Sequence, residues 1–82
     1  MIKVYFFAQF RELLGVDHFN LEASQISSVS DVMGALSTHI EAFDTVIVPR
    51  QTLCAVNQTL VNLEHRVVDG DEVAFFPPVT GG

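Results

Sequence analysis

The chain has 82 residues, of which 49% are hydrophobic, and its ten carboxylates and four cations give a formal net charge of −6. This length predicts one domain, whose seven phenylalanines can fill a core without a metal, and the one cysteine, Cys54, excludes an internal disulfide. No apolar run approaches the roughly 18 residues that cross a bilayer, and the cations are scattered, so we expect a cytoplasmic protein that binds neither membranes nor nucleic acid.

Residues 2–10 are rich in β-branched and aromatic side chains, which predicts a first strand. Alternate residues of a strand point to opposite faces, so one wholly apolar set should meet the core. That set is Ile2, Val4, Phe6, Ala8 and Phe10. Lys3 and Gln9 place the other face in solvent, which leaves Phe7 there as an exposed aromatic residue.

Residues 18–22 alternate in the same way and predict a second strand, paired with the first as a hairpin through a partly helical connection at residues 11–14. Ser28 is a candidate helix N-cap, with Asp31 near the positive end of the helix dipole. The following apolar residues recur at helical spacing, and we interpret their stripe as core rather than as a groove for a partner. They are Val29, Val32, Met33, Leu36 and Ile40.

Residues 41–51 carry no clear pattern apart from a short turn at their start, and Pro49 should keep the segment that follows it from being helical. Residues 53–57 predict a third strand and residues 59–61 a short fourth strand, joined by a turn at Asn57-Gln58.

Residues 69–71, Asp-Gly-Asp, form a strong turn signal before a last strand at residues 72–76. Glu72 marks the solvent face of that strand, and Phe76 shares this face. The chain therefore predicts an α+β fold with a mixed sheet of about five strands and one main helix. Because a single helix covers only one face of a sheet, the other face should meet solvent or a partner.

The sequence predicts no metal site and no self-contained catalytic site. Its three histidines stand apart, with no neighbouring ligand at a recognised spacing. They are His18, His39 and His65. Cys54 lies in an apolar strand, where a buried thiol is inert. Asp69 and Asp71 are interpreted as turn residues.

The C-terminal carboxylate is then the one unusual reactive group. Pro77 and Pro78 favour an extended start for the tail, residues 77–82, which can reach about 20 Å from the domain. Gly81 and Gly82 have no side chains, so the carboxylate can pass through a narrow channel. An ionised carboxylate is a poor electrophile, and it needs activation, most simply as a mixed anhydride with AMP from ATP. Other proteins must supply the catalytic groups for that step and for attack by a sulfur or lysine nucleophile.

The predicted strand order and the Gly-Gly end resemble the ubiquitin-like β-grasp superfamily. Four segments are similar to the small subunits of molybdopterin synthase, the sulfur carriers of the MoaD family. These segments are residues 1–4, 6–9, 55–58 and 69–82. The resemblance implies a β-grasp domain at residues 1–76 and a flexible tail at residues 77–82.

In that family, the resemblance implies, Gly82 is adenylated by an enzyme related to ubiquitin-activating enzymes, at the expense of ATP. A sulfurtransferase system then converts it to a thiocarboxylate. The tail inserts into the large synthase subunit and donates sulfur to cyclic pyranopterin monophosphate, which builds the molybdopterin dithiolene. The inserted residues are Pro77, Pro78, Val79, Thr80 and Gly81.

The resemblance further implies that catalytic residues belong to the large subunit, that the small chain binds no cofactor, and that the two subunits form a heterotetramer. Phe7, Leu60 and Phe76 are predicted to form an apolar patch that docks these partners. Three alternatives stay open. They are a related sulfur carrier for thiamine synthesis or tRNA thiolation, a ubiquitin-like modifier joined to lysines, and an interaction domain with an inert tail.

Overall fold

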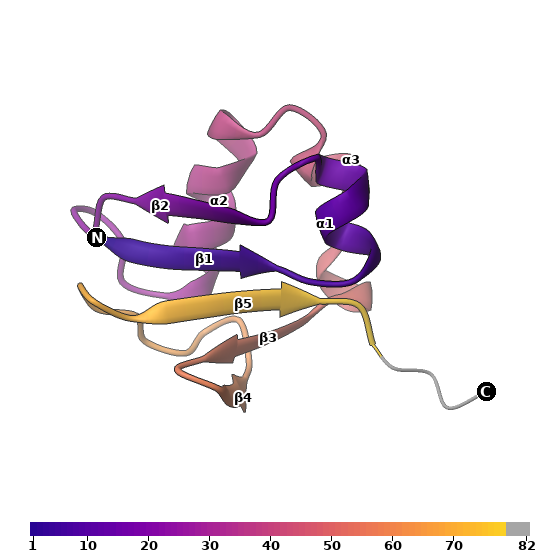
Figure 1. Cartoon of the computed structure of the whole chain (residues 1–82). Helices are drawn as coiled ribbons and strands as arrows, with labels where there is room; N and C mark the ends of the chain where they lie inside the picture. The colour runs from indigo at the N-terminus through magenta and orange to yellow at the C-terminus, as the bar shows by residue number, and fades with distance from the viewer. Residues whose placement is uncertain (79–82) are drawn as a thin grey trace.

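The first and last predicted strands, β1 (Ile2–Phe6) and β5 (Glu72–Phe76), lie side by side and parallel at the centre of the sheet in the computed structural model, which describes residues 1–78 (Figure 1). Antiparallel neighbours flank the pair, so that the strand order of the mixed sheet is β2-β1-β5-β3-β4. The flanking strands are β2 (His18–Leu21), β3 (Leu53–Val56) and β4 (Thr59–Val61).

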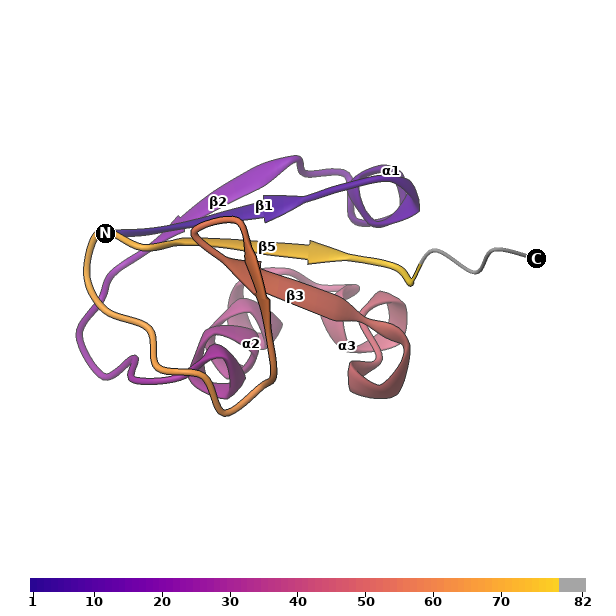
Figure 2. The same ribbon diagram turned by 90° about the horizontal axis from the view of Figure 1, so that it is seen from below.

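Helix α2 (Val29–His39) covers one face of the sheet, and Figure 2 shows it on the same side as the short helix α3 (Phe43–Val46). Ser28 caps α2 as predicted, since its Oγ accepts the backbone N–H of Asp31 at 3.2 Å. The predicted apolar stripe is buried from Val29 to Ile40, which confirms that it belongs to the core.

An aromatic cluster fills the end of the core beneath α3. The ring of Phe6 lies 6.1 Å from that of Phe75 and 6.4 Å from that of Phe43, measured between centroids. All three side chains are buried. Phe43 belongs to residues 41–51, which carry no clear sequence pattern, and its ring completes the core on this side of the sheet.

The first strand is shorter than predicted, because β1 ends at Phe6 and helix α1 (Gln9–Leu14) follows it. Ala8 turns the chain with φ 55°, which takes its side chain away from the core. Phe10 is nevertheless buried, from the helix. Spacings of two and four residues fit one face of a strand, but a spacing of four also fits a helix, so the apolar pattern alone did not reveal the change. The partly helical connection predicted for residues 11–14 is confirmed.

Residues 41–51 are also more helical than predicted. They form α3 and a 3-10 helix, η1 (Pro49–Gln51). The prediction that Pro49 keeps the following segment from being helical is wrong. Proline occupies the first position of η1, where its fixed φ suits a helix and its missing N–H is not needed.

The predicted turns have the expected backbone conformations. Asn57 and Gln58 adopt positive φ angles of 50° and 72°, as a two-residue hairpin turn requires. Gly70 adopts φ 94° in the turn before β5, where glycine carries no steric cost.

In the described part of the chain, no helix has the length and apolar character to span a membrane.

Candidate functional site

The exit point of the C-terminal segment is set by the pairing of β1 with β5. Lys3 donates its backbone N–H to the carbonyl of Asp71 at 3.1 Å, and Phe7 donates to that of Phe75 at 3.2 Å. These bonds hold β5 along the whole length of β1. β5 therefore ends at the end of the sheet away from Met1 (Figure 1), and Pro77 and Pro78 follow there, the first half-buried and the second exposed.

The turn before β5 is anchored by a carboxylate network. Asp71 accepts the backbone N–H of Val68 at 2.9 Å and the side-chain amide of Asn57 at 3.0 Å, and these two bonds lower the pKa of its carboxyl group. Asn57 in turn accepts the N–H of Glu72 at 3.0 Å. Asp69 pairs with the N-terminal ammonium of Met1, which lowers the pKa of that carboxyl group too. The β3–β4 hairpin and the chain start thus both fix the position of β5.

The face of the sheet opposite α2 carries an apolar surface, which we call the open face. The register aligns Tyr5 with Ala74, Ala74 with Ala55 and Ala55 with Leu60, in one row across four strands. Leu53 lies opposite Phe76 in the next row. The open face consists of Tyr5, Phe7, Leu53, Ala55, Leu60, Ala74 and Phe76.

Three side chains of the open face are exposed although they are apolar, whereas Ala55 is buried and the others are half-buried. Phe7 is 47% exposed, Leu60 64% and Leu53 37%. Tyr5 and Phe7 stack with their ring centroids 6.5 Å apart. Their rings and the small Ala74 side chain line a shallow hollow of about 240 Å³. Adjacent exposed aromatic and aliphatic side chains of this kind are typical of a protein-docking surface.

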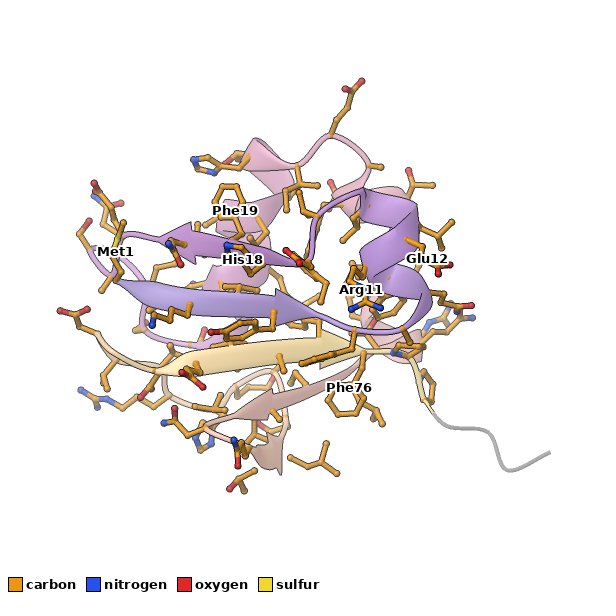
Figure 3. All side chains as sticks on the ribbon, viewed as in Figure 1. Met1, Arg11, Glu12, His18, Phe19 and Phe76 are labelled. Carbon is orange, nitrogen blue, oxygen red and sulfur yellow. The ribbon has the colours of Figure 1, made fainter. Side chains whose placement is uncertain are left out.

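The three residues of the predicted patch share the open face but are not equally close together. Phe7 continues β1 beside Phe75, so the register sets it next to Phe76, whose side chain lies near the end of β5 (Figure 3). Leu60 lies on β4, with β3 between it and β5. Their role in binding a partner stays a prediction.

Tyr5 and Leu53 were missed as members of this surface. Tyr5 alternates with Phe7, so the strand parity already contained its signal. Leu53 becomes a neighbour of Phe76 only through the β3–β5 register, which nothing in the local sequence specifies.

The remaining candidate groups make local contacts within residues 1–78. Cys54 is buried and its Sγ donates to the carbonyl of Val61 at 3.2 Å. Burial raises the pKa of this thiol and keeps it neutral. His18 contacts Asp17, whereas His39 contacts the carbonyl of Ala35. The described residues include no group of three side chains that would hold a metal ion.

The predicted reactive end lies outside the described residues. Val79, Thr80, Gly81 and Gly82 fall in this part of the chain, so their roles in tail insertion and sulfur transfer stay predictions. The division of the chain into a domain at residues 1–76 and a tail at residues 77–82 is likewise a prediction, although β5 ends at Phe76.

Comparison with known proteins links the whole chain to one group. A model of the ThiS family matches residues 4–82. The molybdopterin synthase sulfur carrier subunit of Escherichia coli K12 is 48% identical over 86 aligned positions, which span all of both chains. The crystal structure of SAMP1 from Haloferax volcanii has a TM-score of 0.81 at 25% identity, with 99% of this chain and 98% of that chain covered.

A further solved structure is a complex of subunits 1 and 2 of the molybdopterin-converting factor from Helicobacter pylori. One of its chains matches with a TM-score of 0.68 at 24% identity, covering 99% of this chain and 97% of that chain. At this identity the match concerns the fold. With the strand order above, these neighbours identify the fold as the ubiquitin-like β-grasp that the sequence predicted.

Proposed function

The chain belongs to the ThiS family, and we propose that it is the sulfur carrier subunit of a molybdopterin synthase. The observation that carries this proposal is the relative from Escherichia coli, which bears that name and is 48% identical over the full length of both chains. The proposal also agrees with the chain's own residues, since its Gly-Gly end matches the chemistry of a carrier.

The reaction at the chain end has two steps. The Gly82 carboxylate attacks the α-phosphate of ATP on a partner enzyme, which forms a glycyl adenylate and releases pyrophosphate. A hydrosulfide ion, supplied through a sulfurtransferase system, then attacks the activated carbonyl. A carbon–sulfur bond forms, the bond to AMP breaks, and the product is a C-terminal thiocarboxylate. Glycine suits both steps, because no side chain hinders attack on the carbonyl.

The thiocarboxylate then donates its sulfur to cyclic pyranopterin monophosphate in the large subunit. Two such donations build the dithiolene of molybdopterin, and hydrolysis returns the Gly82 carboxylate. The small chain contributes only four cations, which are scattered in its sequence, so the large subunit must supply the charges that bind the anionic substrate. In this proposal the chain is not catalytic alone and binds no cofactor.

The open face supports docking in this scheme. Residues 77–82 can extend about 20 Å, which is enough to place Gly82 inside a partner's active site while the domain stays on its surface. Phe7 and Phe76 lie next to the point where this segment begins, so docking them directs the tail. We propose that the large subunit and the activating enzyme both use the open face, that the synthase is a heterotetramer, and that it works in the cytoplasm.

A sulfur-transfer assay tests this function. The purified carrier, activating enzyme, ATP, a sulfur donor, the large subunit and cyclic pyranopterin monophosphate should together yield molybdopterin. Acceptor enzymes from thiamine synthesis and tRNA thiolation serve as matched alternatives. Equal or faster transfer to one of them would assign the chain to that branch of the family.

A second candidate function is protein modification. The structure of SAMP1 from Haloferax volcanii matches with a TM-score of 0.81, and SAMP1 from Methanosarcina acetivorans is named a small archaeal modifier protein. In that case Gly82 would end in an isopeptide bond to a lysine of a target protein. Branched peptides carrying the C-terminal residues of this chain, found by mass spectrometry in cells, would support this function. Their absence from cells that make molybdenum cofactor would favour the carrier.

A further inference from the structure

Strand β2 forms an edge of the sheet and presents unused backbone groups. β1 is its one neighbour in the strand order. Phe6 donates its N–H to the carbonyl of Asp17, so in this antiparallel register Phe19 also bonds to β1, whereas His18 and Asn20 direct their backbone groups outward. An outward row of N–H and C=O groups is a template for one more strand.

A hollow of about 730 Å³ adjoins this edge, between β2 and α2. We call it the β2–α2 groove. Its wall includes Phe19, whose ring lies 5.4 Å from that of His39 and beside α2 (Figure 3). The lining residues that matter here are Phe19, Glu22, Ile26, Asp31, Gly34 and Ala35.

The packing of the described residues does not explain why position 34 is a glycine. It lies in the interior of α2, where glycine is less stable than alanine because its backbone loses more freedom on folding. A Cβ built at this position would meet no atom within 4 Å. The packing of the domain would therefore tolerate a side chain at this position. The absence of one leaves the groove open toward α2.

The charge of the groove indicates what would fill it. Glu22 and Asp31 line it, and no lysine or arginine does; Met1 also lines it, with its N-terminal ammonium paired to Asp69. Asp31 accepts the backbone N–H and the hydroxyl of Ser27, both through Oδ2, and these bonds lower the pKa of its carboxyl group. The carboxylate is thus ionised at neutral pH. β2 itself (His18-Phe19-Asn20-Leu21) carries no lysine or arginine, so a second copy paired along β2 would bring no such cation to these carboxylates, which disfavours it as the occupant.

We propose that the β2–α2 groove binds an extended segment of a partner protein as an added strand on β2. An apolar side chain of this segment would lie in the groove against Phe19 and Ala35, and lysine or arginine residues would lie near Glu22 and Asp31. β1 separates β2 from β5. The added strand therefore leaves the open face and the exit of the tail accessible, so a partner here can bind at the same time as the partners of the C-terminal end.

An NMR titration of the full 15N-labelled chain tests this inference. The probe is the end-capped peptide Lys-Val-Lys-Val-Lys-Val, compared with Glu-Val-Glu-Val-Glu-Val and with the lysine peptide N-methylated on alternate residues. The lysine peptide should shift the amides of residues 18–22 and of Gly34 and Ala35. The other two peptides should bind at least about tenfold more weakly, because they lack the charge or the strand hydrogen bonds.

Two variants and their matched controls locate the contact. Gly34→Gln should weaken binding by at least about fivefold by filling the groove, whereas Thr38→Gln, at an exposed α2 position outside the groove, should not. Glu22→Gln should weaken binding about two- to fivefold, and Glu64→Gln should leave it unchanged.

Several outcomes would overturn the inference. These are shifts confined to the open face, equal binding of the N-methylated peptide, an unchanged affinity of Gly34→Gln, or no binding of the lysine peptide at millimolar concentration. Concentration-dependent dimerisation that shifts the β2 amides without peptide would instead assign the groove to a second copy. This inference does not depend on the sulfur-carrier function, because it concerns a different surface.

Discussion

Phe7 donates its backbone N–H to the carbonyl oxygen of Phe75 at 3.2 Å, one residue beyond the end of β1. This bond extends the parallel pairing to the end of β5 and aligns the side chain of Phe7 with that of Phe76 on the open face. The exposed aromatic surface therefore reaches the point where the C-terminal segment begins. A partner that bound this surface would therefore lie beside the start of the C-terminal segment at Pro77.

Phe7→Ala and Phe76→Ala should each weaken binding to the large synthase subunit. Aromatic residues at the centre of an interface cost about 2 kcal/mol or more when truncated, which corresponds to about a thirtyfold rise in Kd. Isothermal titration calorimetry measures the effect. Leu13→Ala is the control, because Leu13 is 61% exposed on α1 and lies outside the open face. Unchanged affinity of both phenylalanine variants would show that the open face does not bind the large subunit.

Phe43→Ala should lower the free energy of unfolding by about 3–5 kcal/mol, because it removes the buried ring that packs edge-on against Phe6 and Phe75. Urea denaturation followed by circular dichroism gives this value. Leu60→Ala provides the comparison, since its exposed side chain should change stability by no more than about 0.5 kcal/mol. Similar small effects of the two variants would contradict the place of Phe43 in the core.

The free energy of unfolding should fall as the pH is lowered below about 4. The pKa of Asp71 is lower in the folded chain than its ordinary value of about 3.9. Its contribution is therefore complete above that value and is lost as the pH falls through the folded pKa. Asp71→Asn should be less stable at pH 7 and should show a smaller loss on acidification. Urea titrations at several pH values measure both effects, with Glu12→Gln on α1 as the control. If the free energy of unfolding of Asp71→Asn depended on pH as it does in the unmodified chain, the proposed stabilisation by the Asp71 carboxylate would be wrong.

Gly34→Ala should stabilise the domain by about 0.5–1 kcal/mol, because alanine loses less backbone freedom in a helix. For a domain of this size such a gain raises Tm by about 2–8 °C. Differential scanning calorimetry measures it. The added methyl group has open space around it. A fall in Tm would mean that the position is crowded and that the groove beside it is not open.

The strands and the main helix could be predicted because local patterns specify them. Ser28 and the apolar spacing behind it predicted α2, and the turns at Asn57 and Gly70 bounded β3, β4 and β5. The extent of β1 could not be predicted, since Phe6 and Phe10 are four residues apart and fit either a strand or a helix. Proline was misread at position 49, because it interrupts a helix but also begins one.

The chemistry at the Gly-Gly end stays a prediction, and the geometry of the open face could be predicted only in part. The Gly-Gly end and Phe7 can be found from residue types and strand parity. The placement of Leu53 beside Phe76, and of β3 between Phe76 and Leu60, depends on pairing between segments far apart in the chain. Such long-range register comes from the packing of the whole sheet, and no local sequence signal encodes it.

The intact mass of the carrier after sulfur loading tests the central claim most directly. The purified chain is incubated with the activating enzyme, ATP and a sulfur donor, and its mass is compared with that of a variant lacking Gly81 and Gly82. We predict that the full chain gains the mass difference between one sulfur and one oxygen atom, located at Gly82 by fragmentation, and that the truncated chain gains nothing while keeping its fold. A full chain without this gain, or a truncated chain with the same gain, would contradict the account.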